Sequence, residues 1–120
     1  MTPQVASAAS SPPSIDGIFR ALSDTTRRDV LERLSVKPAS VSDLAAPYHM
    51  ALPSFVEHLK VLEGSGLVRS HKVGRVRTYE IVPDRLKIAE NWLGKQRKLW
   101  ERRLDQLDAY LLAMKKGDAK

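Results

Sequence analysis

The sequence predicts a mainly helical domain that carries one small β-hairpin. Over residues 15–62, apolar side chains recur every three or four positions, which is the period of amphipathic helices. After Gly64 and Gly66 the period shortens to two on both sides of a turn at Gly74–Arg75, which is the pattern of a hairpin. A helical period returns from Asp84 to about Lys116. Five helices and a two-stranded hairpin are therefore expected.

The composition excludes several classes of protein. At 120 residues the chain has room for one small core, expected over residues 14–116, with residues 117–120 as a short tail. It has no cysteine, which excludes disulfides and thiolate metal sites. No apolar run approaches the roughly 18 residues of a membrane span. Residues 1–13 lack charge and a long apolar centre, so we expect a disordered tail on a cytoplasmic protein and not a secretory signal.

An excess of basic residues favours a polyanionic partner. The chain has 20 Lys and Arg against 14 Asp and Glu, which gives a net charge of +6. General basicity of a soluble protein is the alternative interpretation. The distribution of the cations is more specific than their number, because the segment from Arg69 to Tyr79 has four of them, and His71, without one acidic residue. A phosphate backbone is the partner that suits such a segment.

Three helices are expected before Pro47. The first two cover residues 15–22 and 25–35, and the Lys37–Pro38 pair ends the second. In the segment SVSD, Ser40 has the place of an N-cap, whose hydroxyl accepts a hydrogen bond from the backbone N–H three residues on. The short helix that Ser40 starts should end at Pro47, which has no N–H to donate.

A fourth helix is expected over residues 52–65. Phe55, Leu59 and Leu62 form one apolar stripe, and a proline at position 53 is tolerated because it falls in the first turn. With the stripe inward, a rotation of 100° per residue places another set of side chains on the opposite side. This set comprises Pro53, Ser54, Glu57, Lys60 and Val61. Hydrogen-bonding or small side chains such as Ser54, Glu57 and Lys60 suit a DNA groove, and equally an ordinary solvated surface.

The last helix carries more apolar side chains than one small core can cover. Intervals of four and three separate the members of one apolar row, which Leu93 extends backwards: Trp100, Leu104, Leu107, Leu111 and Met114. A second copy of the chain would cover this row by coiled-coil packing. The alternative is a helix that folds back on its own domain. The aromatic residues Trp92, Trp100 and Tyr110 are expected to pack there, and an unknown small-molecule effector at the interface is the alternative.

This order of elements is that of a winged helix-turn-helix, and several segments resemble one family. The segments are ALSDTTRRDVLERL, SVSDLA, HLKVLEGSGLVRSHKVGRVRTYEI and the long final helix with its tryptophan. Together, over about residues 15–115, they resemble the ArsR family of bacterial winged-helix repressors. The resemblance implies a homodimeric transcriptional regulator, most simply a repressor, that binds double-stranded operator DNA.

The resemblance also assigns roles to the elements. Residues 40–46 would be the positioning helix, residues 52–65 the recognition helix in the major groove, and the hairpin the wing. DNA contacts are therefore expected at Ser40, Ser42, Pro53, Ser54, Glu57, His58, Lys60, Arg69, Lys72, Arg75 and Arg77. The first and last helices would form the dimer, with contacts at Ile18, Phe19, Leu93, Trp100, Leu104, Leu107, Leu111 and Met114. For His58, which adjoins the buried stripe, a structural hydrogen bond is the alternative role.

The sequence also departs from the family. Where many members bind metal through a cysteine pair, this chain has Ser40 and Ser42, and its last helix has no histidine for a second family metal site. No metal and no cofactor are therefore expected. In the recognition helix, Ala51 cannot cap the first turn. Glu57 would be repelled by phosphate, although it could accept a hydrogen bond from cytosine N4.

Two other functions are alternatives to sequence-specific DNA binding. A winged-helix module that binds protein, with weak or no DNA binding, would use the same faces, but the basic wing argues against it. An enzyme is not expected, because there is no cysteine nucleophile, no Gly-rich phosphate loop after a strand, and no grouping of the acidic residues.

Overall fold

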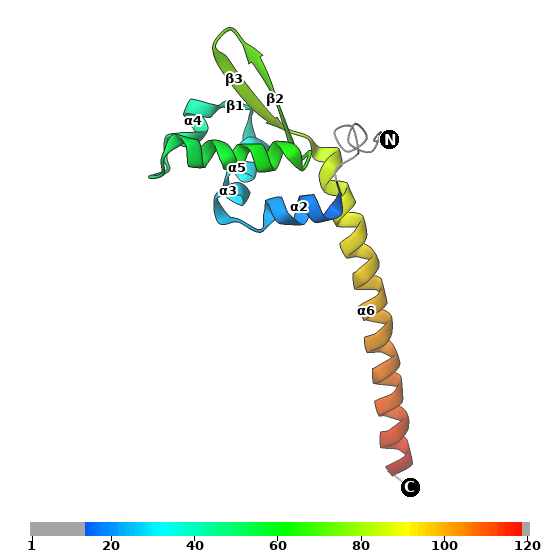
Figure 1. Cartoon of the computed structure of the whole chain (residues 1–120). Coiled ribbons are helices and arrows are strands. Elements are labelled where there is room, and N and C mark those ends of the chain that lie inside the picture. Colours follow the sequence, from blue (N-terminus) through cyan, green and yellow to red (C-terminus); the bar gives the residue numbers. More distant parts are fainter. Residues whose placement is uncertain (1–13, 119–120) are drawn as a thin grey trace, which may run out of the picture. The chain divides into compact units, whose positions relative to one another are not determined.

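The computed structural model describes residues 14–118, which form two compact units (Figure 1). The first unit extends to Ala89 and the second begins at Glu90. The tail predicted over residues 1–13 and the last two residues of the chain lie outside the described residues.

Four helices of the first unit match the predicted ones within two residues at each end. They are α2 (Ile15–Leu22), α3 (Thr25–Val36), α4 (Val41–Ala45) and α5 (Leu52–Gly64). The first three have side-chain N-caps, in which Ser14, Asp24 and Ser40 each accept a hydrogen bond from the backbone N–H three residues on. Ala51 gives α5 no such cap, as its residue type implies.

One hydrophobic core holds these helices together. The predicted stripe of α5 is confirmed, since Phe55, Leu59 and Leu62 have no exposed surface. Side chains from every other element of the first unit pack around them, and the fully or almost fully buried ones are Ile18, Ala21, Val30, Leu34, Leu44, Leu67, Val68, Tyr79 and Ala89. The core therefore fixes the direction of α5 relative to α3, α4 and the sheet.

The predicted hairpin is present, and a third short strand joins it. Strands β2 (Val68–Val73) and β3 (Val76–Ile81) pair antiparallel, and β1 (Ala39–Ser40) pairs with the other edge of β3. The sheet is therefore three-stranded at its base, where the sequence predicts two strands. The two residues of β1 are too few to show a period. Gly74 has a φ of +63° at the first position of the two-residue turn, the place where a type II′ turn needs glycine.

The last helix, α6 (Pro83–Asp118), is continuous. Its first turns belong to the first unit, where Ala89 is buried. From Glu90 to Gly117 no side chain is buried, and the apolar row of the sequence prediction is exposed. Among residues 14–118, no helix combines the length and the apolar character that crossing a membrane requires.

Candidate nucleic-acid interface

The outward face of α5 is polar and accessible, as the sequence predicts. Pro53, Ser54, Glu57 and Lys60 are exposed on the side away from the buried stripe, whereas Val61, predicted for the same side, is half-buried against the core. The Lys60 ammonium lies 3.6 Å from a Glu57 carboxylate oxygen, so the two opposite charges form an ion pair one turn apart. Such a pair is what an ordinary solvated surface, the alternative to a DNA groove, would show. It leaves both side chains about two-thirds exposed, at 69% and 67%.

The four cations of the hairpin are in two different situations. The Arg69 guanidinium lies 2.7 Å from the carboxylate of Glu80, its direct cross-strand partner, and Arg77 donates to the Ser70 hydroxyl at 2.8 Å. The side chains of Lys72 and Arg75 make neither a hydrogen bond nor an ion pair within the described part of the chain. The cations that remain available to an external anion are therefore Lys72 at the end of β2 and Arg75 in the turn.

The strand register places like charges side by side near the tip of the hairpin. Lys72 is directly opposite Arg77, and beyond them Val73 is opposite Val76. Directly opposed like charges weaken a strand pair. The two valines, 70% and 53% exposed, cap this cationic pair with a small apolar tip. A bound anion would relieve the repulsion between Lys72 and Arg77.

A chain of hydrogen bonds connects the hairpin to the end of α5. Arg77 donates to the Ser70 hydroxyl, and Ser70 donates to a Glu63 carboxylate oxygen at 2.7 Å. Beside them, burial raises the pKa of the Tyr79 phenol, and the negative charge of Glu63 adds to the effect. These bonds orient the hairpin relative to α5, so Arg77 has a positioning role that sequence reasoning did not assign to it.

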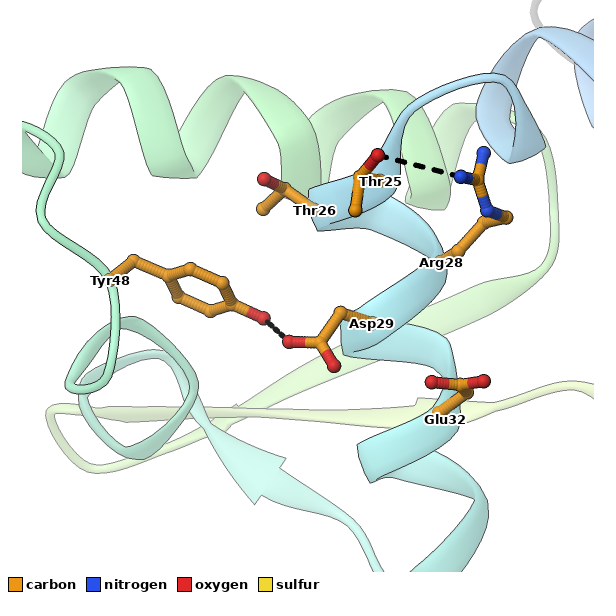
Figure 2. Close-up of a pocket in the computed structure, with 6 residues that line it drawn as sticks. All are labelled: Thr25, Thr26, Arg28, Asp29, Glu32 and Tyr48. Carbon is orange, nitrogen blue, oxygen red and sulfur yellow. Dashed lines mark hydrogen bonds between the residues drawn. The ribbon is translucent and has the colours of Figure 1, made fainter.

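The turn between α4 and α5 is held by residues of α3 that the sequence prediction missed. Arg33 donates to the backbone carbonyls of Leu44 and Asp43 at 2.8 Å each, and these are carbonyls that the end of a helix leaves without partners. The Tyr48 hydroxyl, in the turn, donates to the Asp29 carboxylate (Figure 2). Burial raises the pKa of this phenol, and the bond to Asp29 adds to the effect.

The Tyr48 ring also has two neighbours of its own. It stacks on Phe55 of α5 with centroids 5.2 Å apart, and the Arg33 guanidinium lies 5.9 Å from its centroid. The ring thus links α3, the turn and the first half of α5. No sequence period marks such a residue. The only signal in the sequence is an aromatic side chain in the short segment between Pro47 and Leu52.

His58 makes a structural contact with α3, the alternative role that the sequence analysis gives it. Its Nδ1 lies 3.1 Å from an Arg27 guanidinium nitrogen and 3.6 Å from the Asp24 carboxylate, at the start of α3. The Arg27 backbone N–H, which bonds the same carboxylate, holds the pKa of Asp24 below its usual range, and the neighbouring His58 contributes. His58 therefore makes the structural contact expected as its alternative role, between α5 and the start of α3. Its side chain stays 23% exposed, and the DNA contact expected for it remains a prediction.

At the start of α4, the two serines predicted to touch DNA are in different positions. Ser40 is half-buried, pairs with β3 and caps the helix through a hydrogen bond from the Asp43 N–H at 3.2 Å. Ser42 is exposed on the first turn. Of the two, only Ser42 has a side chain that is both exposed and without a structural partner among residues 14–118.

The predicted dimer residues also separate into two groups. Ile18 has no exposed surface and lies in the core of its own chain, so the contact predicted for it is corrected; Phe19, beside it, is half-buried. The residues of α6 are about half exposed or more: Leu93, Trp100, Leu104, Leu107, Leu111 and Met114. Trp100 lines a shallow apolar hollow with Arg103, Leu104 and Leu107.

Within residues 14–118, no three histidine or acidic side chains meet in a way that could bind a metal ion. The three histidines are separated. His49 lies between α4 and α5, His58 contacts α3, and His71 is on β2.

Comparison with known proteins identifies the class. A helix-turn-helix domain model matches residues 22–71, from the end of α2 to the first half of β2. The crystal structure of an ArsR family transcriptional regulator, RHA00566, superimposes with a TM-score of 0.70 and is 55% identical, over 72% of this chain and 96% of that one.

Two curated relatives are similar over shorter or more divergent stretches. The HTH-type transcriptional regulator Rv2034 of Mycobacterium tuberculosis is 39% identical over 58% of this chain and 65% of its own length, a little under two thirds. The transcriptional repressor SdpR of Bacillus subtilis is 28% identical over 66% of this chain and 88% of its own. With the winged helix-turn-helix described above, these similarities show that the chain belongs to the ArsR family of transcriptional regulators, a class of DNA-binding proteins and not of enzymes.

Proposed function

We propose that this protein is a homodimeric, sequence-specific DNA-binding regulator that represses its own or a neighbouring promoter in the cytoplasm. In this proposal, α5 enters the major groove and the hairpin contacts the phosphate backbone or the minor groove beside it. One observation carries the proposal. Two cations without partners, Lys72 and Arg75, lie at the tip of a hairpin whose base is bonded to the end of α5.

The proposed dimer is supported by the exposed apolar face of α6. Helices are seldom apolar on a solvated side, and a row at intervals of three and four is the pattern that a partner helix covers. Two copies bound side by side would contact two half-sites about one helical turn of DNA apart. Repression is supported by the similarity to SdpR, a transcriptional repressor, and blocked promoter access is the simplest form of repression.

The proposed lack of a metal response is supported by the chemistry of the donors. Serine hydroxyls stand where the family's cysteine pair would be, and hydroxyls are poor ligands for soft ions. Adding Zn²⁺, Cd²⁺ or arsenite should leave operator affinity within experimental error. Tight stoichiometric metal binding that releases DNA would contradict this part of the proposal.

The experiment that tests the proposal is selection from a pool of random double-stranded DNA, followed by titration at several salt concentrations. We expect an enriched sequence with two half-sites and a steep loss of affinity as salt rises. Arg75→Ala should lower the slope of log affinity against log salt by about 1 for each lost phosphate contact. Lys98→Ala on α6 is the matched control and should leave the slope unchanged. Absence of any enriched duplex would favour a protein-binding module instead.

A further inference from the structure

The Glu57–Lys60 pair on α5 places an acceptor and a donor together on the face proposed to meet DNA. The carboxylate oxygen and the ammonium nitrogen are 3.6 Å apart, and both side chains are largely exposed. Within residues 14–118 neither has another polar partner. Each group therefore has hydrogen-bonding capacity left for a ligand, and their spacing of three residues on one helix face places the two groups next to each other.

This arrangement matches the major-groove edge of a G·C base pair. Guanine presents two acceptors there, N7 and O6, and cytosine presents the N4 amino donor. O6 and N4 are hydrogen-bonded to each other, so they are about 2.9 Å apart. An ammonium at guanine and a carboxylate at cytosine N4 would then lie side by side, as Lys60 and Glu57 do. In an A·T pair the adenine N6 donor lies between two acceptors, adenine N7 and thymine O4, and the thymine methyl group lies beyond O4. The ion pair matches this order of groups less well.

The pairing also accounts for an acidic residue on a surface that approaches phosphate. A single carboxylate there would be repelled by every DNA sequence. The Glu57–Lys60 pair adds no net charge to the outward face. The loss of DNA affinity that the Glu57 carboxylate causes is smallest where cytosine N4 donates a hydrogen bond to it. The alternative is a solvated surface pair that contributes little and recognises nothing.

We infer that Glu57 and Lys60 act as one unit that specifies a single G·C base pair in each half-site. Lys60 donates to guanine O6 and N7, and Glu57 accepts from cytosine N4. The inference rests on the proposed function, because it requires α5 to lie in the major groove.

The test compares Glu57→Gln and Lys60→Gln with the wild type. Affinity is measured at one fixed salt for the duplex that the wild type selects from a random pool, and for all its single-base-pair variants. Both variants should lose preference at the same G·C pair, by about 5- to 150-fold. The double variant should lose little more than either single one, because the two groups form one unit. The exchanged variant, Glu57→Lys with Lys60→Glu, should prefer the same position with its two strands exchanged.

A matched control is available on α6. Lys87 and Asp84 form another exposed pair with the same 3.6 Å separation and the same spacing of three residues. Asp84→Asn and Lys87→Gln should change affinity for all duplexes alike and leave every base preference intact.

Three outcomes would overturn the inference. Loss of preference at two different base pairs would show that the residues act separately, and unchanged preferences would show a mere surface pair. In both cases the wild type still enriches a duplex from the pool, so the proposed function is not contradicted. If the wild type enriches no duplex at all, the proposed function fails and this inference fails with it.

Discussion

Three arginines of α3 bind backbone carbonyls at the ends of neighbouring helices. Arg27 and Arg28 donate to carbonyls of the last turn of α2, and Arg33 donates to those of α4. Each guanidinium satisfies acceptors that the end of a helix leaves open. The net charge of +6 therefore overstates the charge available to DNA, because part of it stabilises the fold.

The hydrogen bond from Tyr48 to Asp29 gives a first prediction. Tyr48→Phe keeps the ring on Phe55 and removes only the hydroxyl, so the free energy of unfolding should fall by about 1 kcal/mol in urea denaturation. DNA affinity should fall as well, since the turn before α5 loses an anchor. Tyr110→Phe on α6 is the control and should change neither quantity.

The same tyrosine should make stability sensitive to alkaline pH. The folded state raises the pKa of Tyr48, and that of Tyr79, above the ordinary value of 10.0. The neutral phenols therefore contribute stability that is fully present below about pH 10 and lost as the pH rises through the folded-state pKa. We expect the urea midpoint of the wild type to decline above pH 10, and that of Tyr48→Phe to decline less. Equal declines in both proteins would show that Tyr48 has no part in this loss.

At the scale of elements, α5 lacks an N-cap and can be given one. Ala51 has φ −61° and ψ 142°, the extended conformation of a capping residue. Ala51→Ser should accept a hydrogen bond from the first turn and raise the free energy of unfolding by about 1 kcal/mol. Ala51→Thr should give a somewhat smaller gain, and a loss of stability in both variants would show that the serine hydroxyl finds no donor there.

The cross-strand pair of Lys72 and Arg77 allows stability and DNA binding to be separated. Lys72→Glu replaces two opposed cations with an ion pair, which should stabilise the free hairpin by about 0.2–1 kcal/mol. DNA affinity should fall, because a cation near phosphate becomes an anion. Thermal unfolding should show the gain in stability, and DNA titration of the same preparation should show the loss of affinity. If stability and DNA affinity both rose or both fell, the proposal that Lys72 binds phosphate at the expense of hairpin stability would be contradicted.

The helices and the hairpin were predictable from sequence because periodicity, caps and glycines act locally. The pairs Arg69–Glu80 and Lys72–Arg77 were also within reach, since a two-residue turn at Gly74–Arg75 fixes the register of both strands. The strand β1 was not, because two residues show no period. The sequence offered a structural hydrogen bond as one role for His58. Its partners on α3, and the contacts of Arg33, were not predictable, since they depend on which helix ends the core brings together.

At the scale of the whole molecule, the apolar face of α6 should decide the oligomeric state. Deletion from Leu99 onward should give monomeric or insoluble protein in sedimentation experiments, because the row that a partner would cover is lost. Leu104→Glu with Leu111→Glu should dissociate the dimer while keeping the helix. The control is Arg102→Glu with Ala109→Glu, which has the same spacing on the opposite side. A well-folded dimer in the deleted chain would contradict the proposed interface.

The apolar face of α6 also has a consequence for the amount of protein in a cell. If only paired chains bind two half-sites, the binding-competent form increases with the square of the chain concentration wherever monomers predominate. A doubling of expression would then raise the competent form up to about fourfold, so promoter occupancy would respond more than proportionally to synthesis and dilution. The side chains of this helix would thus set the dose at which the regulated promoter is silenced, without any of them touching DNA.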